Sequence, residues 1–228
     1  VKTFTLDIHL PKAKPGQFIM VWIPGVDEKP FSLVSATPVS FIVARVGPFT
    51  SCLHGMQPGD RLGVRGPLGN GFQIEGAHLL VVGGGYGVAP MYFLAREALA
   101  MGKQVSVVVG ARTADDLLFA RQFQALDVAL SLATEDGSRG VRGFVTNAMG
   151  ALLDVGQTDT SRSRPDSVYA CGPAPMLVAI RSLCQERRLP CQLSWENYMR
   201  CGIGICGSCE RDGWLVCREG PVERLEVK

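Results

Sequence analysis

The chain has 228 residues, of which 46% are apolar and 19% charged, and its formal net charge is +2. This length fits two compact domains and a small appendage, and this composition excludes a long disordered chain. The small net charge gives no indication of a nucleic-acid or lipid-surface partner. No apolar run approaches the ~18 residues of a membrane helix, and residues 1–7 alternate like a strand, unlike a signal peptide. We therefore expect a cytoplasmic protein without a membrane partner.

Residues 1–75 have the pattern of an all-β domain. Short apolar runs are separated by turns rich in Pro and Gly, and the expected strands are 2–10, 18–23, 31–35, 41–46 and 61–64. Short strands with frequent turns are typical of a small barrel. We therefore expect an N-terminal antiparallel β-barrel.

From residue 76 the pattern changes to alternating strands and helices. The expected strands are 79–82, 105–109, 129–134, 168–171 and 192–195. One expected helix begins at Pro90, and two more cover 115–126 and 176–187. The polar stretch 156–166 is interpreted as a surface loop. This alternation predicts an α/β domain with a parallel sheet.

Four of the eight cysteines lie close together near the C-terminus: Cys201, Cys206, Cys209 and Cys217. The first three have the C-x4-C-x2-C spacing of plant-type ferredoxins, and glycines between them let backbone N–H groups approach the sulfur atoms. Structural zinc prefers two C-x2-C pairs, and only one is present. The spacing favours a [2Fe–2S] cluster, while zinc or paired thiols remain alternatives. Because the last residues lack strand or helix periodicity, we expect a metal centre to organise them.

Two segments of the β region are candidates for holding a flavin. The first is Lys29-Pro30-Phe31-Ser32, in which an aromatic ring can pack on a flavin while Lys29 meets a diphosphate. The second contains Gly47, Thr50 and Ser51 at an expected helix start, where N–H groups can bind a phosphate. Read alone, Phe31 is more readily interpreted as a core residue and the second segment as an ordinary helix cap.

Two further segments are candidates for holding a nucleotide. The first lies between an expected strand and an expected helix and contains Gly83, Gly84, Gly85 and Gly87. Glycines at such a place let phosphates reach the helix N-terminus. Their spacing is not the full dinucleotide fingerprint, and no acidic residue follows ~20 positions on. Cys171 ends another strand before Gly172-Pro173, where a thiol can face a nicotinamide or be a buried structural residue.

In this order, these segments resemble the ferredoxin–NADP reductase superfamily. The cluster segment 196–209, ENYMRCGIGICGSC, with CREGPV at 217–222, is most similar to the electron-transfer subunits of class 1B dihydroorotate dehydrogenase. The resemblance covers essentially the whole chain. Relatives such as the γ subunits of sulfhydrogenases carry a similar cluster segment, so they remain an alternative.

The resemblance implies three domains: an FAD-binding β-barrel at 1–75, an NAD-binding α/β domain at 76–190 and a [2Fe–2S] domain at 191–228. It assigns Lys29, Pro30, Phe31 and Ser32 to FAD, Gly47, Thr50 and Ser51 to its diphosphate, and Gly83, Gly84, Gly85, Gly87 and Cys171 to the nicotinamide nucleotide. No catalytic acid or base is expected, because the cofactors carry the chemistry. Two departures are Lys29, where the family usually has Arg, and the lack of one strand that normally begins the barrel.

The resemblance also implies a function and a partner. Electrons would pass between NAD and the FMN of a dihydroorotate-oxidising catalytic subunit in pyrimidine biosynthesis, with two copies of each subunit. The alternatives are the reductase subunit of a sulfhydrogenase-type complex and a zinc-stabilised binding module. Apolar and aromatic side chains near the cluster either form the partner interface or pack beneath the cluster: Tyr198, Met199, Ile203, Ile205 and Trp214.

The choice between NAD and NADP depends on the residues after the second and third α/β strands. Carboxylates at 134–137 would repel a 2′-phosphate, whereas Arg112 and Arg139 could attract one. We expect NAD(H) as the nucleotide.

Overall fold

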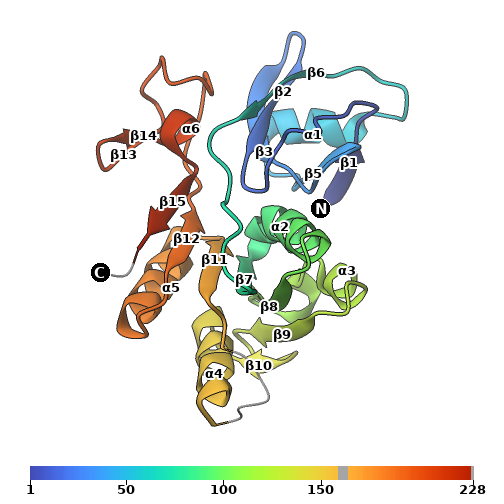
Figure 1. Cartoon of the computed structure of the whole chain (residues 1–228). Helices are drawn as coiled ribbons and strands as arrows, with labels where there is room; N and C mark the ends of the chain where they lie inside the picture. The colour runs from blue at the N-terminus through green and yellow to red at the C-terminus, as the bar shows by residue number, and fades with distance from the viewer. Residues whose placement is uncertain (159–163, 227–228) are drawn as a thin grey trace. The chain divides into compact units, whose positions relative to one another are not determined.

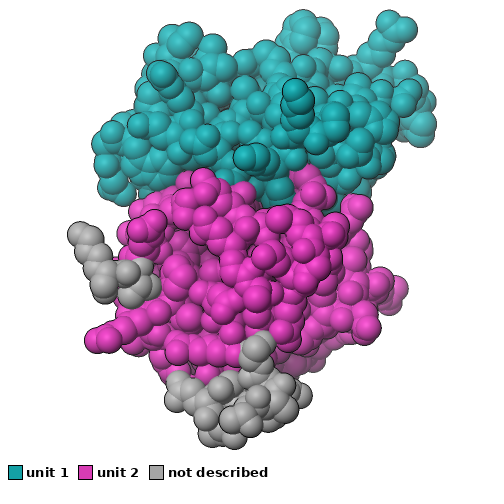
Figure 2. Space-filling view, in the orientation of Figure 1, with its two compact units in different colours: residues 1–71, 197–221 teal, residues 72–196, 222–228 magenta. Residues whose placement is uncertain are grey.

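The computed structural model describes residues 1–158 and 164–226, which form two compact units (Figures 1 and 2). Unit 1 combines residues 1–71 with 197–221, and unit 2 combines 72–196 with the residues from Val222 onward. This division differs from the expected domains 1–75, 76–190 and 191–228. The residues from 191 onward do not form a separate unit, because 191–194 and 222–225 are strands of the unit 2 sheet while 197–221 pack on the N-terminal strands.

Unit 1 is built from antiparallel strands, as expected. One sheet has the order β1-β5-β4 and the other β3-β2-β6; the strands are β1 (Lys2–Thr5), β2 (Phe18–Ile23), β3 (Asp27–Ser32), β4 (Ser35–Ala36), β5 (Val39–Val43) and β6 (Gly63–Leu68). Helix α1 (Pro48–Gly55) follows β5. The two sheets contact each other through Phe31 of β3 and Phe41 of β5, whose ring centroids lie 5.1 Å apart. The first four residues of β2 and every residue of β5 are buried, so both faces of these strands are covered.

Unit 2 contains a seven-stranded sheet in the order β10-β9-β8-β7-β11-β12-β15. Its strands are β7 (His78–Gly84), β8 (Gln104–Ala111), β9 (Ala129–Thr134), β10 (Val141–Arg142), β11 (Ser167–Cys171), β12 (Cys191–Ser194) and β15 (Val222–Leu225). All neighbours are parallel except β12 and β15. Every residue of β7 is buried, as expected for a central strand covered on both faces (Figure 1). The expected parallel α/β sheet is therefore present, with one antiparallel edge.

The helices of unit 2 are α2 (Val88–Ala100), α3 (Ala120–Gln124), α4 (Val145–Thr158) and α5 (Ala174–Glu186). The predicted helix at 115–126 forms only in part, because Phe119 adopts a left-handed conformation with φ 59° that separates a 3₁₀ turn from the short α3. The sequence prediction also missed α4, which includes residues 156–158 of the predicted loop, while 159–163 lie outside the described residues. In the part that the structure describes, none of the helices has both the length and the hydropathy that a membrane span requires.

Candidate cofactor sites

The last two clustered cysteines are brought together by a hairpin. Strands β13 (Glu210–Arg211) and β14 (Trp214–Leu215) pair antiparallel across Asp212 and Gly213, which have φ angles of 48° and 88°. Such angles form a tight turn that Gly and Asp tolerate. The hairpin places Cys209 beside Cys217, whose backbone N–H donates to the Cys209 Sγ at 3.4 Å. Both side chains are buried.

The first two clustered cysteines lie on a loop shaped by left-handed glycines. Gly202 and Gly204 have φ angles of 69° and 80°, which other residues rarely adopt. These turns direct backbone N–H groups at sulfur: Ile203 donates to the Cys201 Sγ at 3.5 Å and Gly204 to the Cys217 Sγ at 3.1 Å. Backbone donors of this kind stabilise thiolate charge.

The four thiols are arranged as two neighbouring pairs. Hydrogen bonds from Ser208 and the Cys201 region lower the pKa of the Cys206 thiol to about 6, whereas burial and the neighbouring Cys209 raise the pKa of Cys217 to about 11. Cys201 contacts Cys206, and Cys209 contacts Cys217. Among the described residues, no three potential ligands converge on one point as a single metal ion requires. Together the two pairs offer the four thiolates that a [2Fe–2S] cluster takes.

The cluster segment packs on strand β2 and leaves part of its loop in solvent. The apolar cluster beneath it consists of Phe18, Met20, Met199, Cys209, Val216 and Cys217, with Leu68, Trp214 and Leu215 at its edge. Tyr198, Ile203 and Ile205 are instead 63%, 47% and 79% exposed. The candidate interface residues thus separate into two groups. Met199 and Trp214 pack beneath the loop, and the other three stay available for a partner.

The candidate flavin residues line strand β3 and the start of α1. Phe31 is half-buried in an aromatic column, 5.1 Å from Phe41 and 6.2 Å from Phe49 between ring centroids. The Lys29 ammonium group forms an ion pair of 2.5 Å with Asp27, so its charge is already partly neutralised. An aromatic face next to a partly exposed polar strand suits an isoalloxazine ring. The contacts in this column are equally consistent with Phe31 as a core residue.

The start of α1 has a cation that the sequence analysis missed. The Thr50 hydroxyl accepts hydrogen bonds from the N–H groups of Val46 and Gly47, each at 2.9 Å, and so closes the turn before the helix. Arg45 donates to the Ser51 hydroxyl at 3.3 Å and is exposed. A cation beside a helix N-terminus is a favourable place for a diphosphate. The signal was the Arg-Val-Gly-Pro run directly before the predicted helix.

The candidate nucleotide residues meet where the strand order of the sheet reverses. Strands β7 and β11 are neighbours, and Gly83 is paired with Cys171 at their carboxyl ends. Gly87 lies so close that a Cβ there would be 2.4 Å from the carbonyl of Cys171. Such a reversal point is where open α/β sheets bind ligands. The structure therefore brings the glycine loop and Cys171 together.

Cys171 itself is a buried thiol. It is 3% exposed, and burial, followed by the nearby Glu196 carboxylate, raises its pKa to about 12. Its thiol also interacts with the Ser194 hydroxyl. Cys171 is therefore a protonated thiol at neutral pH. Neither Ser194 nor Glu196 has a local sequence signal for this position: the parallel pairing of β11 and β12 places Ser194 opposite Cys171, and Glu196 follows two residues later.

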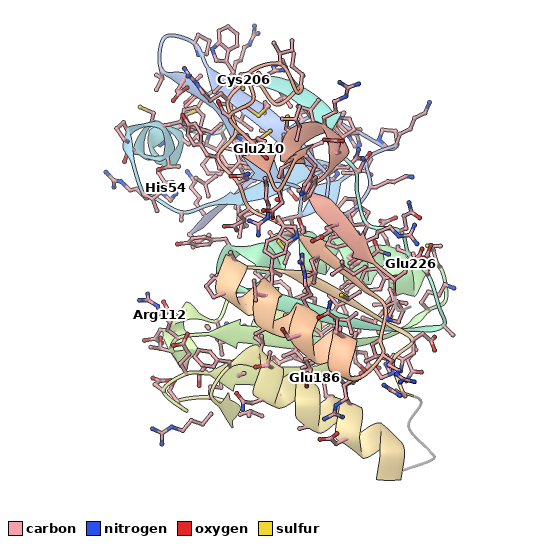
Figure 3. All side chains as sticks on the ribbon, turned by 90° about the vertical axis from the view of Figure 1, so that its left-hand side faces the viewer. His54, Arg112, Glu186, Cys206, Glu210 and Glu226 are labelled. Atoms are coloured by element: carbon pink, nitrogen blue, oxygen red, sulfur yellow. The ribbon has the colours of Figure 1, made fainter. Side chains whose placement is uncertain are left out.

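The candidate adenosine residues lie after β8 and β9. The two loops are joined by a hydrogen bond from the Asp136 N–H to the Arg112 carbonyl at 3.2 Å. Hydrogen bonds from Ser138 lower the pKa of the Asp136 carboxyl, so it is an anion at neutral pH. The Arg112 side chain is 80% exposed and projects away from the sheet (Figure 3).

Two family models match the chain. An oxidoreductase NAD-binding domain matches residues 81–182, and the iron–sulfur cluster binding domain of dihydroorotate dehydrogenase B matches residues 196–226. The first covers the glycine loop and Cys171, and the second covers all four clustered cysteines.

Curated relatives match over nearly the whole chain. A probable dihydroorotate dehydrogenase B (NAD(+)) electron transfer subunit from Methanothermobacter thermautotrophicus is 45% identical over 97% of this chain and 82% of the relative. A protein of the same name from Thermococcus kodakarensis is 43% identical over 97% of this chain and 89% of the relative.

Solved structures share the fold. A structure of NADH-dependent reduced ferredoxin-NADP oxidoreductase has a TM-score of 0.81 and 32% identity over 97% of this chain and 83% of that one. A ferredoxin reductase of carbazole 1,9a-dioxygenase has a TM-score of 0.64 and 26% identity, covering 79% and 59%. The fold, the NAD-binding and iron–sulfur domains and the relatives agree, and the chain belongs to the electron-transfer subunits of dihydroorotate dehydrogenase B, in the ferredoxin–NADP reductase superfamily.

Proposed function

We propose that this chain passes electrons between NAD and the FMN of a dihydroorotate-oxidising catalytic subunit. The observation that carries the proposal is that Cys201, Cys206, Cys209 and Cys217 lie in a segment that matches the dihydroorotate dehydrogenase B cluster domain, in which backbone N–H groups donate to three of the four sulfur atoms. When bound, NAD exchanges a hydride, FAD converts between two-electron and one-electron transfer, and the [2Fe–2S] cluster carries single electrons.

Unit 1 holds the residues for FAD and for the cluster. Phe31 offers the flat side of the aromatic column, while Arg45 and Ser51 offer a cation and a hydroxyl at the start of α1. Lys29 is the alternative cation, and its pairing with Asp27 makes Arg45 the better candidate for the diphosphate. The backbone N–H groups of Ile203 and Gly204 orient toward the cluster sulfurs.

Unit 2 holds the residues for NAD. In the glycine loop at 83–87, Gly85 and Tyr86 are exposed and no other residue crowds the backbone of Gly85, so we place the diphosphate beside Gly85. Cys171, kept neutral by burial, offers a thiol of low polarity against a nicotinamide ring. No side chain in the described part is assigned a role as catalytic acid or base.

The partner is proposed from the family and from the exposed part of the cluster loop. An electron-transfer subunit requires a catalytic subunit, and we place its FMN-bearing surface against Tyr198, Ile203 and Ile205. Exposed aromatic and aliphatic side chains of this kind form the cores of interfaces. A complex with two copies of each subunit is our expectation for the assembly.

The test compares the isolated chain with the chain reconstituted with its catalytic subunit. The isolated chain should reduce artificial dyes with NADH and leave dihydroorotate untouched, and adding the FMN-bearing subunit should couple dihydroorotate oxidation to NAD⁺ reduction. Oxidation of dihydroorotate by the isolated chain would contradict the proposal. A hydrogenase captured as the native partner would leave the cofactor sites standing and refute the proposed pathway.

A further inference from the structure

An ion pair on the strands of unit 1 reaches the cluster loop. Arg65 of β6 and Glu28 of β3 lie on either side of β2 and form a two-point contact, Nε to Oε1 at 2.8 Å and Nη2 to Oε2 at 2.6 Å. The same Nη2 donates a second hydrogen bond, at 3.0 Å, to the backbone carbonyl of Cys201. One guanidinium therefore joins a carboxylate to a residue that is distant in sequence and is a proposed cluster ligand.

The cluster loop rests on the same face of these strands. A Cβ on Gly202 would lie 3.0 Å from Cγ of Met20 and 3.3 Å from Cδ1 of Leu68, so the loop is in close contact with β2 and β6. Met20 is fully buried and is paired with Arg65 across the β2–β6 ladder. The position of Cys201 relative to Arg65 is thus fixed by packing as well as by the hydrogen bond.

We propose that Arg65 and Glu28 are positioning residues that set the reduction potential of the cluster, with opposite signs. The inference rests on the proposed function, because it requires a cluster on Cys201. Reduction adds one negative charge to a site that already carries thiolate charge, so a nearby cation favours the reduced form and a nearby anion disfavours it. Arg65 contacts the ligand residue directly, and Glu28 lies behind it and offsets part of its charge.

The other charged residues near the loop are unchanged when Arg65 or Glu28 alone is substituted. Arg200 precedes the first cysteine, Arg218 follows the last, and Asp27 is paired with Lys29. The Arg65–Glu28 pair lines an open hollow of about 810 Å³ that also includes Trp22 and Val26, so water and salt reach it. The effect of the pair should therefore be larger at low ionic strength.

The experiment is an EPR-monitored redox titration of the full chain at low salt. Arg65→Gln should shift the ratio of reduced to oxidised cluster, at fixed potential, toward oxidised by about threefold to tenfold, and Glu28→Gln should shift it toward reduced. A tenfold shift corresponds to about 59 mV for a one-electron couple. The double variant should return toward the wild-type ratio. Arg61→Gln, which removes an exposed cation from the same segment, is the matched control and should shift the ratio less than twofold.

The two signs separate electrostatic tuning from a structural role. If Arg65→Gln loses the cluster, Glu28→Gln decides the question alone, because it keeps the guanidinium. Unchanged ratios in a Glu28→Gln chain with full cluster content, or shifts of the same sign in both variants, would overturn the inference while leaving the proposed function intact. Wild-type chain without any [2Fe–2S] signal would refute the proposed function itself.

Discussion

The backbone of Gly87 lies directly against the carbonyl of Cys171, so closely that a Cβ on Gly87 would be 2.4 Å from both the carbon and the oxygen. This contact places the start of α2 at the carboxyl end of β11. Gly87 is thus required for close packing of a helix on a strand.

Replacing Gly87 with Ala should damage the nucleotide site of unit 2. Because the added methyl meets backbone rather than a flexible side chain, we expect a loss of about 1–3 kcal/mol in unfolding free energy and at least tenfold weaker NADH binding. Urea unfolding and NADH titration measure the two effects. Gly150→Ala on α4 is the control, since a Cβ added there would have no other atom within 4 Å, and it should stabilise by about 0.5–1 kcal/mol. Equal behaviour of the two variants would contradict the expectation.

Replacing Cys209 with Ser should remove the cluster. Cys209 is 1% exposed and lies in the apolar cluster between the hairpin and β2, so the substitution both removes a proposed iron ligand and buries a hydroxyl. Iron and sulfide content should fall below about a tenth of the wild-type value, and the EPR signal should vanish. Cys52→Ser, at an exposed cysteine, should keep both. A full complement of iron in the Cys209 variant would rule out Cys209 as a ligand.

The sequence predicted the central strands of unit 2 and the position of the cysteine-rich loop, because both depend on local signals. Strand periodicity identified β7, β8, β9 and β11, and the C-x4-C-x2-C spacing identified the loop that the structure folds around sulfur. Gly102 follows the end of α2 with φ 73°, a conformation in which glycine commonly ends a helix. Each of these signals can be read from a stretch of only a few consecutive residues.

Features that depend on distant pairing could not be predicted in the same way. Strand β15 has no clear alternation and exists because it pairs with β12. Arg65 became relevant only when β6 placed it beside a loop far along the chain. The break at Phe119 also had no sequence signal, since an aromatic residue rarely adopts a positive φ.

Alkaline pH should weaken unit 2 through Cys171. Burial raises the pKa of this thiol from 9.0 to about 12, so above pH 9 the folded protein holds a proton that the unfolded chain releases. The stability that this thiol contributes is complete below pH 9 and is lost as pH rises toward 12. Between pH 8 and pH 10 the loss should be about 1.4 kcal/mol. Urea unfolding at both pH values measures this loss. The unfolding free energy of Cys171→Ser should fall by about 1.4 kcal/mol less than that of the wild-type chain between the two pH values. An identical fall in both chains would contradict a buried neutral thiol.

The preference for NADH should depend on Asp136. Its carboxylate, held ionised by Ser138, lies in the loop proposed to meet the adenosine ribose and would repel a 2′-phosphate. Asp136→Asn should therefore reduce the ratio of kcat/KM for NADH over NADPH by up to about tenfold, or about 1.4 kcal/mol. Glu186→Gln, an exposed carboxylate on α5, should leave the ratio unchanged. A wild-type chain that prefers NADPH tenfold would refute the assignment.

The exposed tip of the cluster loop should be needed for the catalytic partner. Ile205 is 79% exposed and lies one residue before Cys206, so it contributes little to folding while it stands closest in sequence to the exposed ligand. Burying a carboxylate against an apolar partner surface is costly, so Ile205→Glu should weaken the complex at least tenfold. Unfolding free energy should change by less than about 0.5 kcal/mol.

The control is Val178→Glu, which introduces the same charge at a 52% exposed aliphatic residue on α5. Sedimentation of the two variants with the proposed catalytic subunit, together with NAD⁺ reduction by dihydroorotate, measures assembly and electron flow. We expect both to fall for the Ile205 variant alone, with dye reduction by NADH retained because that reaction stays within this chain. Loss of assembly in the Val178 variant and not in the Ile205 variant would place the partner on unit 2 instead of the cluster loop.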